Sequence, residues 1–405
     1  MQLLDAVLRK GLPLEAALAG ATRDLDRPDD RAFVHAMVAE TLRCLTDLDA
    51  LIDEATAKPL PMDAKARFAL RLALVQALRL ETPPHAAIAT ILPLVDGGPR
   101  RLVHGVFGAL MRREARLPDP PSLPVATTLR WREAWGDGVV SAAERAIASP
   151  PPLDISFPPG SPPDFEGTSL AAGHIRLPAG TAVTGLSGFG DGLAQWWVQD
   201  LAASIPARLL GAGDGRKALD LCAAPGGKTM QLAASGFRVT AIDVSKSRLA
   251  RLAENFARTG LEAEIVIADV MKWSPPEAVD AILLDAPCSA TGIFRRHPDV
   301  LYRARPKVIA EMAALQTAML ARAFDWLRRG GFLIYSVCSL EPAEGEAVAA
   351  RLTESREDCR IDPIRAGELP AGLAPSGEGW LRILPGTLEP EGGCDSFFVA
   401  RFERA

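Results

Sequence analysis

The stretch "DLCAAPGGKT" (residues 220–229) decides how the second half of the chain folds. It is typical of an apolar strand that runs into a tight glycine turn and then into a helix. Gly226 and Gly227 let the backbone approach a ligand closely, and the free N–H groups of a helix start favour a polar or anionic group. The spacing fits neither GxGxxG nor GxxxxGK[ST], so the loop indicates a nucleotide-type ligand but argues against an NTPase.

Strand-like and helical stretches alternate from residue 217 to the end of the chain. Apolar runs such as "KALDLC", "FRVTAID", "VDAILLDAP" and "FLIYSVC" are separated by helical stretches such as "SKSRLARLAENFARTG" and "PKVIAEMAALQTAMLARAFDW". This alternation predicts a doubly wound α/β sheet with mostly parallel strands. Ligands of such sheets bind at the carboxyl ends of the strands, so we expect the site there.

The glycine turn, Asp243 and Asp269 end three successive predicted strands. Asp243 could accept hydrogen bonds from two ribose hydroxyls and would repel a phosphate at the same place. Asp269 could accept a hydrogen bond from an adenine amino group. The pattern favours a nucleoside cofactor without a 2′-phosphate. S-adenosylmethionine fits this description, while NAD remains open on fold grounds alone.

Composition bounds the class of protein. The 405 residues suggest two or three domains at roughly 150 residues each, and a hydrophobic content of 48% suffices for packed cores. The net charge of −5 and the pI of about 5.7 argue against an indiscriminate polyanion binder, although a local basic face could bind nucleic acid. No run reaches the ~18 apolar residues of a membrane span, and the charged N-terminal stretch is typical of an amphipathic helix and not of a signal peptide.

The cysteines and histidines show no metal-ligand spacing. The six cysteines are scattered without a CxxC pair, and the five histidines form no HExxH motif. We therefore expect free thiols in a reducing cytoplasm, with neither a metal site nor a membrane partner. Cys44, Cys359 and Cys394 are expected to be ordinary buried residues.

Proline-rich stretches at residues 116–124 and 149–167 divide the chain. Before them, apolar residues at three- and four-residue spacing predict helices over 29–52, 63–80 and 99–118. Asp29 or Asp30 is the expected cap of the first of these, and its predicted buried face is Phe33, Val34, Met37, Val38, Leu42 and Leu45. The last of the three carries arginines that indicate a solvated face, or alternatively a phosphate-contacting patch: Arg100, Arg101, Arg112, Arg113 and Arg116.

The segment 190–210 predicts one more amphipathic helix. Trp196 and Trp197 within it are expected to lie in a core more than against a base or a cofactor. These observations divide the chain into a helical domain (1–140), a small module (150–210) and an α/β domain (211–405).

Four stretches resemble, in order and spacing, the motifs of the Nop/Sun family of RNA cytosine-5 methyltransferases: "DLCAAPGGKT", "DAPCSATG", "RRHPD" and "YSVCSLEPAEGE". The helical front, with "DRAFVHAMVAETLR", is similar to the NusB-type RNA-binding domain of the bacterial small-subunit rRNA enzymes in that family. The module over 150–210 corresponds only by position to a small RRM-like module. The resemblance implies an all-α NusB-like domain, a small α+β linker module and a C-terminal Rossmann-like class I methyltransferase domain.

The resemblance also implies that S-adenosyl-L-methionine binds along the glycine loop and the acidic strand ends. The cofactor-binding residues are then Cys222, Ala223, Ala224, Pro225, Gly226, Gly227, Lys228, Asp243, Asp269 and Asp285. Lys228 could contact the cofactor carboxylate or a substrate phosphate. For Arg295, Arg296 and His297, phosphate contacts and surface ion pairs are equally weighted interpretations.

Cys288 and Cys338 each follow a predicted strand, at a spacing of fifty residues (338 − 288 = 50). A thiolate that adds to carbon 6 of cytosine makes carbon 5 nucleophilic toward a methyl sulfonium, and a further acid/base group then helps the thiol to leave. A lone cysteine is usually a small buried hydrophobe, but two thiols at matched strand ends favour this chemistry. The spacing alone does not say which thiol attacks.

The resemblance assigns the nucleophile to Cys338, and elimination and product release to Cys288. DNA cytosine-5 methyltransferases use a proline-cysteine motif as nucleophile, so attack by Cys288 remains open. Asp285 would hydrogen-bond the base at N3 and at the amino group, and Asp-Ala-Pro-Cys in place of (N/D)PP(Y/F) favours carbon methylation.

The expected substrate is 16S rRNA, from which the target cytosine must be turned out of its stack. Two alternatives remain: a tRNA cytosine-5 methyltransferase, and a non-catalytic RNA-binding assembly factor with a degenerate methyltransferase fold. The intact cysteines, Asp285 and glycine loop argue against the second alternative.

Overall fold

The computed structural model describes residues 1–189 and 195–405, and over these residues the chain forms two compact units. One unit contains Met1–Ser149 together with Phe294–Arg305, and the other contains Pro150–Ile293 and Pro306–Ala405. The segment 150–210 therefore belongs to the second unit, and the predicted three-part division remains a prediction. Over the described parts of the chain, no helix is long and apolar enough to cross a membrane.

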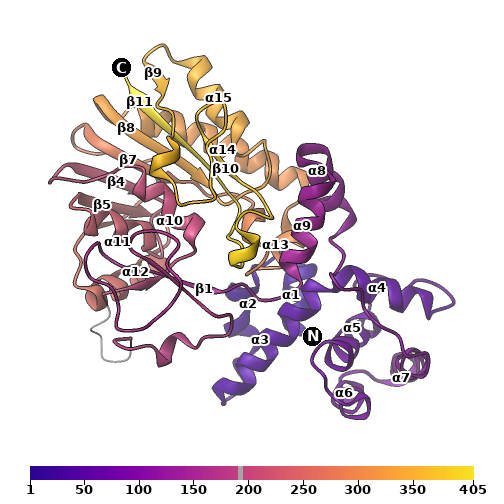
Figure 1. Ribbon diagram of the computed structural model, residues 1–405. Helices are drawn as coiled ribbons and strands as arrows, with labels where there is room; N and C mark the ends of the chain where they lie inside the picture. Colours follow the sequence, from indigo (N-terminus) through magenta and orange to yellow (C-terminus); the bar gives the residue numbers. More distant parts are fainter. Residues whose placement is uncertain (190–194) are drawn as a thin grey trace. The chain divides into compact units, whose positions relative to one another are not determined.

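The first unit is built from helices (Figure 1). They are α1 (Gln2–Leu8), α2 (Leu14–Ala21), α3 (Pro28–Arg43), α4 (Leu45–Glu54), α5 (Lys65–Leu78), α6 (Pro84–Ile91), α7 (Gly97–Arg112), α8 (Val125–Trp135), α9 (Asp137–Ile147) and the short α13 (Val300–Arg303). Helix α5 is buried almost along its whole length. Its Arg71 is fully buried and forms a bidentate ion pair with Asp49, at 2.7 and 2.8 Å, which offsets part of the cost of removing both charges from water.

One predicted helix of this unit is interrupted. The helix predicted over 29–52 breaks at Cys44, which ends α3 and begins α4. The predicted caps Asp29 and Asp30 are wrong, because Arg27 caps α3 and Pro28 occupies its first turn. Phe33 was placed on the buried face but is 49% exposed, whereas Val38, Leu42 and Leu45 are buried as predicted.

The second unit contains a sheet that, within the described residues, has eight strands. They are β4 (Lys217–Leu221), β5 (Arg238–Asp243), β6 (Glu264–Ile267), β7 (Val279–Asp285), β8 (Leu327–Val337), β9 (Cys359–Ile361), β10 (Leu381–Ile383) and β11 (Phe397–Arg404). The order is β10-β11-β8-β7-β4-β5-β6, with β9 beside β11. Strands β4 to β8 pair in parallel and β11 pairs antiparallel, so the predicted, mostly parallel sheet is confirmed.

Helices cover both faces of this sheet (Figure 1). Helices α14 (Pro306–Phe324) and α15 (Glu346–Ser355) pack in one core cluster with β7 and β8. Helix α10 (Leu201–Arg208) packs with the other face, and α11 (Gly227–Ala234) and α12 (Lys246–Thr259) connect β4, β5 and β6. Residues 268–278, all described, join β6 to β7 without a helix.

A small antiparallel sheet precedes the large one. Its strands are β1 (Leu153–Ser156), β2 (His174–Leu177) and β3 (Trp197–Val198), in the order β2-β1-β3. The helix predicted over 190–210 is therefore wrong at Trp197 and Val198, which form β3 ahead of α10. Residues 190–194 lie outside the described residues. The core placement of Trp196 and Trp197 is confirmed, since they are 3% and 2% exposed.

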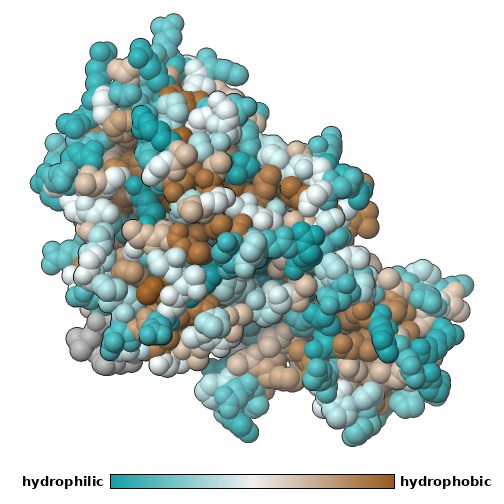
Figure 2. Space-filling view, in the orientation of Figure 1, coloured by the Kyte–Doolittle hydropathy of each residue, from teal (hydrophilic) through white to brown (hydrophobic). Residues whose placement is uncertain are grey.

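Hydrophilic residues are spread over much of the surface visible in Figure 2, and hydrophobic residues form smaller patches between them. This distribution agrees with the separate buried cores of the two units. On α7 and just after it, all five arginines that the sequence singled out are exposed: Arg100, Arg101, Arg112, Arg113 and Arg116. Their exposure fits a solvated face and a phosphate-contacting patch alike.

Candidate active site

The glycine loop connects β4 to α11, as the sequence predicts. Gly226 caps α11 in a left-handed conformation, with φ +106°, which strongly favours glycine. A Cβ atom at this position would also lie 2.9 Å from Cγ of Leu252 on α12. The loop is therefore built around a position that tolerates no side chain.

A cavity of about 360 Å³ lies against this loop. Its volume falls in the range that small ligands and cofactors occupy. Of the residues predicted to bind a cofactor, it is lined by Cys222, Ala223, Ala224, Pro225, Gly227, Lys228 and Asp285. The loop and the end of β7 thus meet at one cavity, as expected for the carboxyl ends of parallel strands.

Asp220, near the end of β4, also lines the cavity and is a residue that the sequence reasoning missed. Its side chain is 1% exposed, and Oδ2 accepts a hydrogen bond from Oγ1 of Thr229 at 2.6 Å. Among the described residues, its Oδ1 has no hydrogen-bond partner. Burial raises the pKa of Asp220 to about 7. A buried acceptor without a partner at a cavity wall is suited to a ligand donor. The available signal was an acidic residue inside an otherwise apolar strand.

Asp243 and Asp269 do not line this cavity. Asp243 is 2% exposed, and its two carboxylate oxygens accept hydrogen bonds from the backbone N–H groups of Ala224, at 3.2 Å, and Ser245, at 2.8 Å. It thereby ties the end of β5 to the glycine loop. Asp269 follows β6, is half-buried, and accepts a hydrogen bond from the backbone of Met271 at 2.9 Å. Their contacts with ribose and adenine remain predictions.

Lys228 and Asp285 form an ion pair beside the cavity, with 2.7 Å between Nζ and Oδ2. The other oxygen of Asp285 accepts a hydrogen bond from Oγ of Ser336 at 2.8 Å. Burial alone would lower the pKa of Lys228, but the Asp285 carboxylate outweighs it and the pKa is raised, with a smaller contribution from Cys338. Lys228 is therefore a cation held between a carboxylate and a cysteine.

Cys288 and Cys338 are brought together. They follow the neighbouring parallel strands β7 and β8, and their Sγ atoms are 3.5 Å apart. The hydrogen bond to Cys338, burial and the negative charges of Cys338 and Glu344 raise the pKa of Cys288 well above its ordinary value. Cys288 therefore keeps its proton.

The remaining four cysteines are buried or half-buried, which disfavours their reactive thiolate form. Burial is the main cause that raises the pKa of Cys44 and of Cys359, each to about 12. Burial also raises the pKa of Cys222, which is half-buried and has a positive φ of 65° at the start of the glycine loop. Cys394 is buried.

The "RRHPD" segment lies in the first unit, whereas Cys288 and Cys338 belong to the second. The Arg295 side chain is 5% exposed, and its backbone carbonyl accepts a hydrogen bond from Arg43 at 2.6 Å. Tyr302, further along the segment, donates to the carbonyl of Leu42 at 2.8 Å. A phosphate contact is therefore wrong for Arg295, because its side chain is buried. Arg296 and His297 are half-buried, and their roles remain open.

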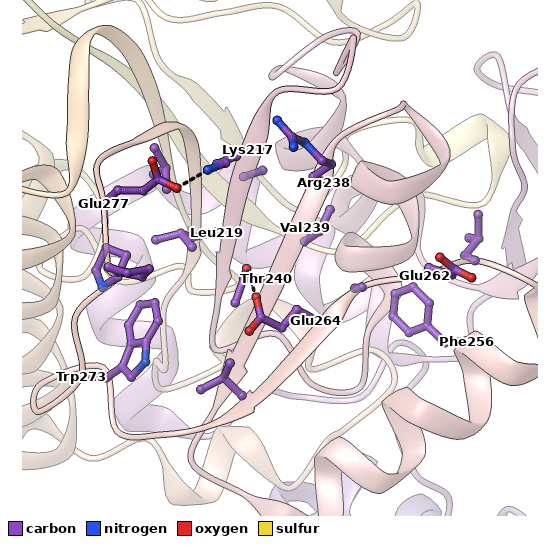
Figure 3. A pocket seen from close by; sticks show the side chains of 17 residues that line it. Lys217, Leu219, Arg238, Val239, Thr240, Phe256, Glu262, Glu264, Trp273 and Glu277 are labelled. Carbon is purple, nitrogen blue, oxygen red and sulfur yellow. Dashed lines mark hydrogen bonds and ion pairs between the residues drawn. The ribbon is translucent and has the colours of Figure 1, made fainter.

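A larger cavity, of about 800 Å³, lies at the opposite ends of the strands (Figure 3). Lys217, Arg238 and Glu264, the first residues of β4, β5 and β6, line it. Lys217 forms an ion pair with Glu277, and Thr240 donates a hydrogen bond to Glu264 at 2.9 Å. The cavity contains no thiol and lies away from the glycine loop.

Comparisons with known proteins agree with both halves of the resemblance. Residues 207–403 match the family model of 16S rRNA methyltransferase RsmB/F, and residues 1–111 match the NusB family. Ribosomal RNA small subunit methyltransferase B of Xylella fastidiosa (strain 9a5c) is 34% identical, over 99% of this chain and 98% of that protein. The protein of the same name from Klebsiella pneumoniae subsp. pneumoniae is 31% identical, over 99% of this chain and 96% of its own.

Solved structures share the fold. The crystal structure of PH0851 superposes with a TM-score of 0.77 at 21% identity, covering 100% of this chain and 98% of the other. A methyltransferase homolog protein from Pyrococcus horikoshii superposes with a TM-score of 0.57 at 23% identity, covering 69% and 95%. At these identities the likeness concerns the fold alone.

Proposed function

The chain belongs to the RsmB/F family of 16S rRNA methyltransferases, and from that premise we propose that it methylates carbon 5 of a cytosine in 16S rRNA. The methyl donor is S-adenosylmethionine, and the reaction proceeds through a bond between Cys338 Sγ and carbon 6 of the base. The observation that carries the proposal is the thiol pair, with its sulfur atoms 3.5 Å apart at the carboxyl ends of β7 and β8. A ligand cavity and the Lys228–Asp285 pair adjoin it.

The residues around the cavity fit S-adenosylmethionine. This molecule carries an ammonium group and ribose hydroxyls as donors, and Asp220 offers a buried oxygen without a partner at the cavity wall. The backbone of the glycine loop and the start of α11 provide N–H donors for its carboxylate. Asp243 and Asp269 are the proposed partners of the ribose and the adenine. When bound, the molecule supplies an electrophilic methyl group on a sulfonium.

Cys338 is the proposed nucleophile because of its surroundings. Its neighbour Cys288 retains its proton, because the hydrogen bond to Cys338 and burial raise the pKa of Cys288, and Cys288 is therefore the poorer nucleophile of the two. The Cys338 sulfur donates an electron pair to carbon 6, and the electrons of the carbon 5–carbon 6 double bond move to carbon 5. Carbon 5 would then take the methyl group, and the electron pair of the methyl–sulfur bond would stay on the donor's sulfur, which leaves as a neutral thioether.

Release reverses the addition. A base such as water takes the proton from carbon 5, the electrons of that C–H bond restore the ring double bond, and the Cys338 thiolate leaves carbon 6. The Cys288 thiol, at 3.5 Å, donates a hydrogen bond to the departing thiolate. Asp285, beside both Lys228 and Ser336, is the proposed partner of the base at N3 and its amino group.

RNA binding is assigned to the first unit. A cytosine in folded rRNA must leave its stack at a cost of a few kcal/mol, so binding energy from elsewhere on the chain is needed. The five exposed arginines on and after α7 are the proposed phosphate contacts. Such contacts predict RNA binding that weakens as the salt concentration rises.

The test is a denaturing gel of the protein after incubation with 16S rRNA and S-adenosylmethionine. Cys288→Ala is expected to accumulate a slow protein–RNA band, because addition occurs but release is impaired. Cys338→Ala is expected to give no band while cofactor binding measured by calorimetry persists. Cys359→Ala, at a buried cysteine outside the site, is the control and should behave like the wild type. A band with Cys338→Ala and none with Cys288→Ala would reverse the two roles.

A further inference from the structure

The loops that carry Cys288 and Cys338 share one buried carboxylate, that of Glu344, which is 0% exposed. Its Oε1 accepts hydrogen bonds from the backbone of Ser289 at 2.8 Å and from Nε2 of Gln316 at 3.2 Å. Its Oε2 accepts hydrogen bonds from Oγ of Ser339 at 2.5 Å and from Oγ of Ser289. Ser289 directly follows Cys288, and Ser339 directly follows Cys338.

Further hydrogen bonds fasten the same two loops to each other. The hydroxyls of Ser289 and Ser339 are 3.2 Å apart. Thr291 Oγ1 accepts a hydrogen bond from the backbone of Leu340 at 2.9 Å, and the backbone of Gly292 donates to the carbonyl of Cys338 at 3.0 Å. A Cβ atom at Gly292 would lie 2.1 Å from the carbonyl oxygen of Ser396, so the loop fits only with glycine there. The two cysteine loops are therefore joined by one hydrogen-bonded network, here called the frame, which consists of residues 289–292, 338–340 and Glu344.

The four donors to Glu344 are neutral: one backbone N–H, two hydroxyls and one amide. Burying a carboxylate costs free energy, which its hydrogen bonds offset only in part. A purely structural link between two loops would not need a carboxylate. A carboxylate supplies two features that an amide lacks, namely four acceptor positions on two equivalent oxygens and a negative charge.

We propose that Glu344 is a positioning residue for the thiol pair. By accepting hydrogen bonds from the serine that follows each cysteine, Glu344 holds Cys288 and Cys338 within hydrogen-bond distance of each other. The inference rests on the proposed function and deepens it. Glu344 does not line the cavity beside the glycine loop, and the described hydrogen bonds of its side chain are to the two loops and to Gln316, so it acts through the loops.

The charge of Glu344 adds an electrostatic consequence. Its negative charge is one of the causes that raise the pKa of Cys288, after the hydrogen bond to Cys338, burial and the charge of Cys338. Lys228, by contrast, interacts with Cys338. Glu344 therefore helps to keep the proton on Cys288, and in this way it disfavours attack by that sulfur.

Glu344→Gln is the test variant, because the side chain keeps its shape but loses its charge and half of its acceptors. The first measurement needs neither RNA nor cofactor: iodoacetamide alkylation of Cys288 and Cys338 against pH, resolved by mass spectrometry of the peptides. Cys288 in the variant is expected to react about threefold faster at pH 8, because the negative charge of Glu344 is one of the causes that raise the pKa of this thiol. The second is methyl transfer to 16S rRNA, where kcat is expected to fall about tenfold while KM for the RNA and the cofactor affinity change less than twofold.

Glu368→Gln is the matched control. This carboxylate lies in the same unit and pairs with Arg401 at 2.7 Å, outside the thiol loops. It is expected to lower the melting temperature without altering the alkylation profile or kcat. An unchanged Cys288 profile together with an unchanged kcat in Glu344→Gln would overturn the inference.

Ser289→Ala and Ser339→Ala decide the question if Glu344→Gln does not fold. Each removes one hydroxyl of the frame but keeps the charge of Glu344. Both are expected to lower kcat about threefold and to leave the alkylation profile of Cys288 unchanged; wild-type kcat in both would sink the inference. Should Cys288→Ala form no RNA adduct while the alkylation shift still occurs in Glu344→Gln, the proposed function fails and the role of Glu344 in the thiol pair stands.

Discussion

A lysine–carboxylate pair lies at each end of the sheet. The lysine of one pair begins strand β4, and the lysine of the other lies in α11, the helix that follows β4. Lys217, at the amino end, pairs with Glu277 beside the cavity of about 800 Å³, and the two side chains are 41% and 62% exposed. Lys228, at the carboxyl end, pairs with Asp285 beside the smaller cavity, and the two are 12% and 30% exposed. An exposed pair is screened by water and contributes little, whereas a half-buried pair shifts the ionisation of its neighbours.

The comparison teaches that volume does not locate the chemistry in this protein. The larger cavity holds paired surface charges and no nucleophile. The smaller cavity is lined by Asp220, whose Oδ1 has no described partner, and by Lys228, whose pKa is raised. The thiols of Cys288 and Cys338 lie nearby. Unsatisfied and mutually perturbing groups mark a reaction site better than space does.

The sharpest contrast between the two ends comes from removing the thiol. Cys338→Ala is expected to lower methyl transfer by at least ~10³-fold, because no other group forms the bond to carbon 6. Leu219→Val, in the wall of the amino-end cavity, should change methyl transfer less than twofold. Labelled-methyl incorporation into 16S rRNA measures both. Substantial turnover in Cys338→Ala would break the comparison.

The lysine pair gives the next largest effect. Lys228→Met is expected to lower kcat about a hundredfold, because it removes the cation that faces Asp285 and Cys338. Lys217→Met is the matched control and should stay within twofold of the wild type. Single-turnover kinetics with saturating cofactor separate this loss from weaker binding. If Lys217→Met lowered kcat as much as Lys228→Met, the carboxyl and amino ends of the strands would not differ in their contribution to catalysis.

Asp220→Asn probes the buried oxygen and is expected to weaken S-adenosylmethionine binding about tenfold, as loss of one charge-assisted hydrogen bond predicts. Calorimetric titration measures this affinity. An unchanged affinity would remove Asp220 from the cofactor site.

The same variant tests the raised pKa. Burial raises the pKa of Asp220 from 3.8 to about 7, so the folded state binds this proton more tightly than the unfolded state does. The resulting stability is complete below about pH 4 and is lost as the pH rises through 7. Melting temperatures of cofactor-free protein between pH 5 and 8 should therefore fall less steeply in Asp220→Asn than in the wild type. Parallel curves would contradict the assignment.

The smallest expected effect is that of Ser336→Ala. Its hydroxyl donates to Asp285 at 2.8 Å, and loss of one such hydrogen bond corresponds to about 1 kcal/mol, or roughly a fivefold fall in kcat. Steady-state kinetics with 16S rRNA measure the change. A loss as large as that of Lys228→Met would show that Ser336 does more than orient the carboxylate.

Much of this carboxyl end could be predicted from the sequence. The glycine turn and the cysteines at strand ends are local patterns, and the alternation of strands and helices places all of them at one edge of the sheet. The 3.5 Å between Cys288 and Cys338 depends in addition on β7 and β8 being neighbours, which the chain order alone does not determine.

What escaped prediction depends on individual atoms and on packing. Asp220 and Glu344 are single acids whose importance lies in which oxygens have partners, and no spacing encodes that. Likewise, the helix predicted over 29–52 breaks at Cys44, and β3 replaces the start of the helix predicted over 190–210. In both places tertiary packing overrides a helical pattern.

The most direct test of the account is to identify the residue that carries cytidine in the adduct formed by Cys288→Ala. After incubation with 16S rRNA and S-adenosylmethionine, nuclease and protease digestion followed by mass spectrometry should yield a nucleotide-modified peptide. The account predicts that the modified residue is Cys338, with the methyl group already on the base. A modification at any other residue, or no modified peptide from protein that binds the cofactor normally, would contradict it.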